Sequence, residues 1–80
     1  MSVEVRSAID KMTLEVGKKV GKYWVADFTV KDVLDRIGKK NTQIEQNYIR
    51  YVVLGQYQGS VITPGQGDNG GFIRMKIRTT

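Results

Sequence analysis

Three glycines spaced as G-x-G-x-x-G, from Gly65 to Gly70, are the residues best suited to holding a phosphate. In nucleotide-binding proteins this pattern follows a strand and opens a helix, whose N-terminal N–H groups then bind the phosphates. An extended run at residues 60–63 does precede the glycines. The residues after them alternate between apolar and basic from Ile73 to Arg78, which is the period of a strand. The sequence therefore predicts the tip of a β-hairpin at this place, and no nucleotide site.

Two absences limit the catalysis that the chain could perform, since it contains no histidine and no cysteine. The commonest general base, the nucleophilic triads and the Cys/His zinc sites are thereby excluded. Asp32 and Asp35 lie on one turn of a predicted helix, but a helix cap and a solvated surface explain them better than an acid–base pair. We therefore expect no enzymatic activity, no metal and no cofactor.

The composition also bears on where the protein resides. The absence of cysteine excludes disulfides and favours an intracellular protein, in the cytoplasm or nucleoid, or in the nucleus of a eukaryote. The N-terminal residues lack a continuous apolar segment, so we expect neither a signal peptide nor a membrane span.

The net charge of +5 is unevenly distributed along the chain. Residues 1–35 hold six basic and six acidic residues, whereas residues 36–80 hold seven basic residues against two acidic ones. Such an asymmetry suggests that one surface meets a polyanion. A basic surface that only aids solubility is the alternative that charge alone leaves open.

The chain length and the hydrophobic content predict one α+β domain covering residues 1–80. A first helix is expected at residues 3–17, before the interruption of the helical pattern by Gly17 and Gly21. Residues 23–26 favour a short third strand of the sheet, and a longer first helix that runs to Tyr23 is the alternative. The apolar face of the first helix is formed by Val5, Ile9, Met12 and Val16.

Local signals bound a second helix at residues 30–37. Thr29 is predicted to cap the amide of Asp32, and Gly38 suits the position after the helix. Phe28 and Val33 occupy the positions of a hydrophobic staple.

A third helix is expected at residues 43–54, opened by the capping box of Thr42 and Glu45 and stopped by Gly55. A two-stranded hairpin over residues 59–78 follows it. The predicted apolar side of the helix comprises Ile44, Tyr48, Ile49, Val52 and Val53. In the last strand, the residues expected to face the core are Ile73, Met75 and Ile77.

The segments FTVKDVLDRIG and NTQIEQNYIRYVV, followed by a basic hairpin, resemble a winged helix-turn-helix domain. The likeness extends from Val3 to Arg78 and rests on the order and patterning of the elements, three helices and then a two-stranded wing. It implies that the third helix enters the major groove of DNA and that the wing touches the backbone or the minor groove. Such motifs often carry alanine where the two helices pack, and Leu34 lies near that position.

Two groups of side chains are suited to contact DNA. Glutamine and asparagine can pair with adenine and arginine with guanine, so the expected base-facing residues on the third helix are Gln43, Gln46, Asn47 and Arg50. The residues expected to contact phosphates, at the turn and on the last strand, are Lys39, Lys40, Thr42, Arg74, Lys76 and Arg78. An ordinary solvated surface is the alternative for the helix, and protection of a sheet edge is the alternative for the strand.

These patterns predict a DNA-binding protein, either a small transcriptional regulator or a replication accessory factor, with double-stranded DNA as its partner. The alternative is a protein-interaction module of the same fold, which would bind an acidic protein through the surface around Tyr51, Tyr57 and Phe72. Both a monomer and a homodimer fit the sequence, since the first helix could offer Val3 and Leu14 to a second copy.

Overall fold

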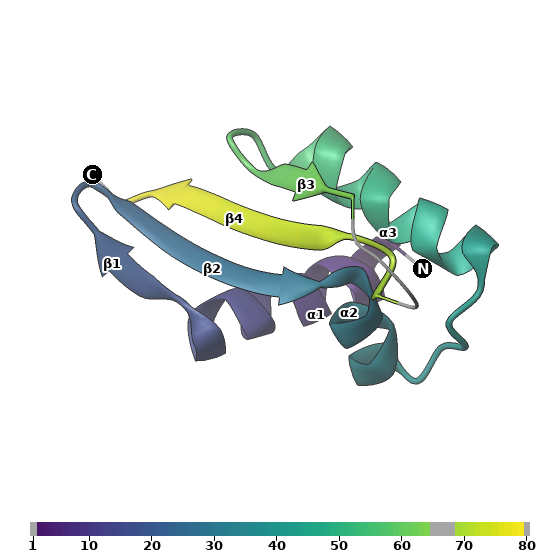
Figure 1. Ribbon diagram of the computed structural model, residues 1–80. Helices are drawn as coiled ribbons and strands as arrows, with labels where there is room; N and C mark the ends of the chain where they lie inside the picture. Colours follow the sequence, from purple (N-terminus) through teal and green to yellow (C-terminus); the bar gives the residue numbers. More distant parts are fainter. Residues whose placement is uncertain (1, 65–68, 80) are drawn as a thin grey trace.

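The computed structural model describes residues 2–64 and 69–79, and within them the chain forms three helices and a four-stranded antiparallel sheet (Figure 1). The sheet has the order β1-β2-β4-β3, so β4 is paired on both sides. The expected α+β class is confirmed. The helices are α1 (Ser2–Val16), α2 (Val30–Ile37) and α3 (Gln43–Gln56). The strands are β1 (Lys18–Val20), β2 (Tyr23–Thr29), β3 (Val61–Thr63) and β4 (Phe72–Arg78).

The helices occupy the segments expected to be helical, but the sheet is larger than the sequence pattern indicates. The strand expected at residues 23–26 is the start of β2, which runs on to Thr29, and β1 is not predicted at all. α3 continues through Gly55 and is capped by Tyr57. The hairpin pairs β3 with β4, whereas the predicted tip at residues 65–68 lies outside the described residues.

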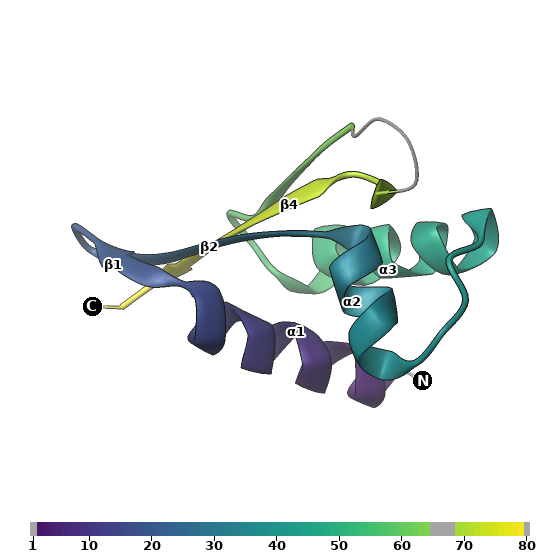
Figure 2. The same cartoon turned by 60° about the horizontal axis from the view of Figure 1, so that its bottom comes forward.

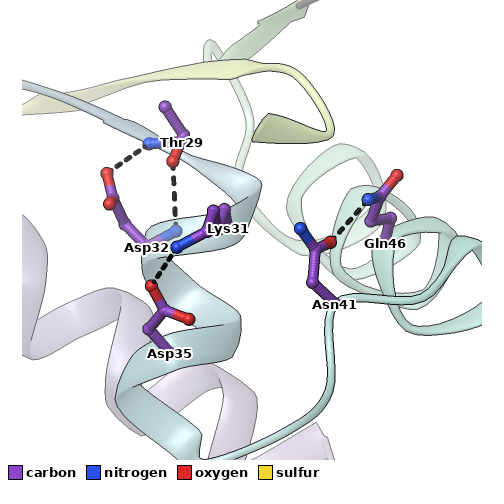
Figure 3. A network of polar contacts seen from close by, with 6 residues as sticks. All are labelled: Thr29, Lys31, Asp32, Asp35, Asn41 and Gln46. Atoms are coloured by element: carbon purple, nitrogen blue, oxygen red, sulfur yellow. Dashed lines mark hydrogen bonds and ion pairs between the residues drawn. The ribbon is translucent and has the colours of Figure 1, made fainter. Parts of the chain in front are cut away.

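Reciprocal hydrogen bonds at the start of α2 determine where β2 ends. The Asp32 N–H donates to Thr29 Oγ1 at 3.0 Å, and the Thr29 N–H donates to Asp32 Oδ2 at 2.9 Å (Figure 3). Asp35 accepts a hydrogen bond from Lys31 Nζ at 2.8 Å. Gly38 then ends the helix with a φ of 72°, which favours glycine. The Asp32 carboxylate therefore serves the helix cap, and the Asp35 carboxylate forms an exposed ion pair with Lys31.

The hydrophobic core lies between the helices and one side of the sheet, and the helices lie together on that side (Figure 2). Its most deeply buried side chains come from α1, α2, α3 and β4: Ile9, Val30, Val33, Leu34, Ile49, Val52, Val53, Ile73 and Met75. Three residues expected in the core are instead exposed, Val16 by 55%, Ile44 by 80% and Ile77 by 40%. Each lies at or near the end of its helix or strand, where the opposing layer no longer covers it.

Trp24 lies on the helix side of the sheet and fixes the end of α1. Its indole Nε1 donates to the Thr13 carbonyl at 2.7 Å. Thr13 is itself buried, and its hydroxyl donates to the Ile9 carbonyl at 2.7 Å. A Cβ at position 17 would overlap the indole and the Thr13 carbonyl, so Gly17 is required for the chain to pass from α1 into β1 at this point.

Tyr57 connects the end of α3 to α1. Its hydroxyl donates to Asp10 Oδ1 at 2.8 Å. Burial, assisted by this hydrogen bond, raises the pKa of Tyr57 to about 12. This hydrogen bond holds the Tyr57 side chain against α1.

We expect the raised pKa of Tyr57 to make folding stability depend on alkaline pH. The folded protein retains the phenolic proton up to about pH 12, whereas the unfolded chain releases it near the ordinary pKa of 10.0. The stabilisation is therefore complete below about pH 10 and is lost as the pH rises toward 12. Urea unfolding should show the midpoint falling more steeply over this range in the wild type than in Tyr57→Phe. If the urea midpoint fell equally steeply with pH in the two proteins, the raised pKa of Tyr57 would not be the cause of the lost stability.

Candidate nucleic-acid interface

Four polar side chains on α3 form one hydrogen-bonded surface, here called the α3 polar stripe: Gln43, Gln46, Asn47 and Arg50. Asn47 Oδ1 accepts from Gln43 Nε2 at 3.0 Å and from Arg50 Nη1 at 2.7 Å. Gln46 Oε1 accepts from Arg50 Nη2 at 3.4 Å. The spacing in the sequence placed these residues on one face, and the structure brings all four together.

Arg50 joins the α3 polar stripe to the segment that leads into β4. Its Nε and Nη2 atoms donate to the Gly70 carbonyl at 2.9 and 2.6 Å. A Cβ on Gly70 would lie 3.0 Å from the Gln46 side chain, and its φ is 75°, so glycine permits the close approach. The next residue, Gly71, accepts the Val30 N–H at 3.0 Å through its carbonyl. The start of β4 is therefore held by both α3 and α2.

This position differs from the one expected for Arg50. The guanidinium is half-buried and faces the hairpin, where the sequence pattern predicts that it faces a base. Gln46 is similarly occupied, since its Nε2 donates to Asn41 Oδ1 at 2.6 Å (Figure 3). The exposed members of the stripe are Gln43 and Asn47. Within the stripe, Asn47 accepts hydrogen bonds through its side-chain oxygen Oδ1. Its side-chain NH₂ group is therefore the donor best placed for a ligand.

The turn between α2 and α3 places cations beside the N-terminal end of the stripe. Lys40 is exposed and Lys39 is half-buried. The Thr42 hydroxyl accepts the Glu45 N–H at 3.3 Å, so its own O–H can still donate to a phosphate oxygen. These three residues therefore lie where the sequence predicts phosphate contacts, at the start of α3.

The side of the sheet that faces away from the helices is here called the open face (Figure 2). The strand register arranges its side chains in four rows. From the β1–β2 turn toward α2, the rows are Val20–Tyr23–Arg78, Lys18–Val25–Lys76, Asp27–Arg74–Val61 and Thr29–Phe72–Thr63. The predicted strand cations thus lie on the opposite side of the sheet from the core and from α3.

Arg74, one of the three strand cations predicted to contact phosphates, is paired with a carboxylate. Its Nε and Nη2 atoms donate to the Asp27 carboxylate at 2.9 and 3.1 Å across the strand pair. The hydrogen bond from Arg74 lowers the pKa of Asp27 below its ordinary value. Protection of a sheet edge does not explain the cations either, since β4 is paired with β2 and with β3.

Lys76 differs from Arg74 in its surroundings. The Lys76 ammonium lies 4.4 Å from the centroid of the Tyr23 ring, a cation–π contact worth about 0.5–1 kcal/mol at an exposed site. Lys18 reaches the same surface from β1, on the far side of Val25. Sequence reasoning missed Lys18 because β1 was not predicted. The G-K pair at Gly21 and Lys22, which forms the turn into β2, is the local signal that could have revealed it.

A second feature that the sequence pattern did not indicate is an exposed apolar ridge on α3. Tyr51 is 73% exposed and Leu54 is 65% exposed, and they follow the exposed Ile44 along the helix. The pattern had placed Ile44 in the core. The ridge runs beside the α3 polar stripe.

Comparison with protein-family models, curated proteins and solved structures gives no significant match for this chain. In the described residues, 2–64 and 69–79, no helix is both long enough and apolar enough to cross a membrane. Function is therefore inferred from the geometry and charge of the surfaces above.

Proposed function

We propose that this chain is a small winged helix-turn-helix DNA-binding protein, acting as a transcriptional regulator or a replication accessory factor. α3 enters the major groove, and the β3–β4 hairpin lies beside it on the backbone. The element order from α1 to β4, with β4 inserted between β2 and β3, is compatible with this fold. The observation that carries the proposal is the α3 polar stripe, which Arg50 fastens to the hairpin at Gly70.

The chemistry of the exposed residues supports a base-reading role for α3. Gln43 and Asn47 carry amide groups that can pair with the donor and acceptor of adenine in the major groove. Lys39, Lys40 and the Thr42 hydroxyl are at the helix start, where backbone phosphates would anchor the helix. In this proposal Arg50 positions the stripe and the hairpin relative to each other.

Salt dependence of binding to a random-sequence duplex tests the proposal. We expect the logarithm of the affinity to fall linearly with the logarithm of salt concentration, and the slope to become shallower by about 0.9 for each lysine that contacts a phosphate. Fluorescence anisotropy of the wild type and of the Lys39→Gln/Lys40→Gln variant, between about 50 and 200 mM salt, measures both slopes.

Lys11→Gln controls for the loss of a lysine charge away from the turn, because Lys11 is an exposed lysine on α1. Its slope should equal that of the wild type. Absence of duplex binding even at the lower salt would refute the proposal for this chain. A turn variant whose slope matches that of the wild type would show that the lysines do not contact phosphates.

The exposed ridge on α3 favours a second candidate, a protein-interaction module. Ile44, Tyr51 and Leu54 would then contact a partner. This ridge shares Tyr51 with the surface around Tyr51, Tyr57 and Phe72 that the sequence suggests. A photo-reactive side chain at position 51 separates the two candidates. Cross-links from position 51 to a protein that survive nuclease treatment, without duplex binding, would favour the interaction module. Cross-links to a duplex would favour the DNA-binding protein.

A further inference from the structure

We infer that the two rows of the open face nearest the β1–β2 turn form a second nucleic-acid site, which binds single-stranded DNA. These rows, here called the far rows, consist of Val20, Tyr23 and Arg78 and of Lys18, Val25 and Lys76. The inference goes beyond the proposed function, since it concerns another surface and does not depend on duplex binding by α3.

The far rows carry a concentrated positive charge. Lys18 and Lys76 flank Val25 from the two neighbouring strands, and Arg78 follows Lys76 on the same face of β4. None of the six side chains in these rows is acidic. The carboxylate in the adjoining row belongs to Asp27, which already accepts two hydrogen bonds from Arg74. Lys18 and Lys76 are the cations of the far rows that we expect to meet a polyanion.

The spacing of the cations suits a flexible phosphate backbone. Lys18 and Lys76 are two strand spacings apart, about 10 Å between their backbones, and Arg78 is about 6.6 Å along β4 from Lys76. Arg78 is also the cross-strand partner of Tyr23, so cations and ring share one patch. Phosphates bound by these cations would place a base close to the ring.

Tyr23 distinguishes a single strand from a duplex or from an acidic peptide. An aromatic ring among cations can stack with an unpaired base, whereas the bases of a duplex are stacked on one another and show only their edges. The surface is a sheet face with no helix in the described chain projecting from it into a groove (Figure 2). Base stacking on a ring is stronger than an exposed cation–π contact, so a base can displace the Lys76 ammonium and leave it to a phosphate.

The far rows and the α3 polar stripe are separate surfaces. The helices lie on the other side of the sheet, and the far rows are at the end that extends away from α2 and α3 (Figure 1, Figure 2). The start of β4 is the part of the sheet near α3, whereas Arg78 is the last residue of that strand. Loss of function at one surface should therefore leave the other intact.

The experiment measures anisotropy of a labelled oligothymidine of about 12 nucleotides against the full chain. We expect Tyr23→Leu to weaken binding at least about fivefold and Tyr23→Phe, which keeps the ring, to bind like the wild type. Lys18→Gln/Lys76→Gln should make the salt slope shallower by about 0.7 for each lysine that contacts a phosphate. Lys11→Gln, which removes one lysine charge from α1, should have no effect.

A second comparison separates this inference from the proposed function. Tyr23→Leu should bind a duplex as the wild type does, and Asn47→Ala should bind oligothymidine as the wild type does. The inference is overturned if oligothymidine does not bind or if Tyr23→Leu and the double lysine variant leave its affinity unchanged. It is also overturned if Asn47→Ala weakens oligothymidine and duplex binding alike, since a single surface would then serve both. Retained Trp24 fluorescence in each variant shows that the fold is intact.

Discussion

Leu34→Ala is expected to lower the free energy of unfolding by about 2–5 kcal/mol. Leu34 is fully buried in the core, on a helix that contacts both α1 and α3. Leucine fills the space between the helices here, so truncation leaves a cavity. A domain of this size has a total stability of about 4–12 kcal/mol, and much of it would be lost. Urea unfolding followed by Trp24 fluorescence measures the change.

Leu54→Ala is the matched control for this truncation, because the same atoms are removed from a side chain that is 65% exposed. Its free energy of unfolding should stay within about 0.5 kcal/mol of the wild type. If Leu34→Ala cost no more than the control, Leu34 would not pack between the helices as described.

Arg50→Lys is expected to release the start of β4 from α3 while keeping the charge. A lysine cannot reproduce the two hydrogen bonds to the Gly70 carbonyl and the contact with Asn47. We expect the free energy of unfolding to fall by about 1–2 kcal/mol, and amide exchange at Gly71 and Phe72 to accelerate. If the proposed function holds, duplex affinity should fall at least about fivefold, because the α3 polar stripe and the hairpin are no longer held in one position relative to each other.

Arg36→Lys controls for the exchange of an arginine for a lysine. Arg36 is bound to Glu15 on α1 through two hydrogen bonds, apart from the α3 polar stripe. This variant should retain the duplex affinity and the amide exchange of the wild type. Unchanged exchange at Gly71 in Arg50→Lys would mean that Arg50 does not hold the hairpin. Altered exchange with unchanged duplex affinity would argue against the proposed use of the stripe.

Local sequence signals were sufficient for the helices, because each signal acts within one turn. Thr29 and Asp32 are three residues apart and cap α2 reciprocally, and Gly38 ends it. β1 was missed since its three residues are all exposed and show no apolar alternation. The break at Gly17 was visible, but its cause, the indole of Trp24, depends on a contact across the fold. Periodicity alone could not supply that contact.

The same distinction applies to the candidate site. Helical spacing placed Gln43, Gln46, Asn47 and Arg50 on one face, and their mutual hydrogen bonds agree with that. The role of Arg50 was not predictable, because its acceptor at Gly70 is 20 residues away. The pairing of Arg74 with Asp27, separated by 47 residues, likewise depends on strand order. Sequence patterns thus identified the candidate residues, and non-local pairing determines how each is used.

The central place of β4 in the sheet has a consequence for the kinetics of folding. β2 and β3 are not neighbours in the sheet, and each pairs with β4. The pairing of Thr29 with Phe72 encloses α2, α3 and β3 in one loop of chain, whose closure costs entropy before the sheet exists. Folding should therefore be slower than that of a helical bundle of equal length, and the joining of β2 to β4 should limit the rate.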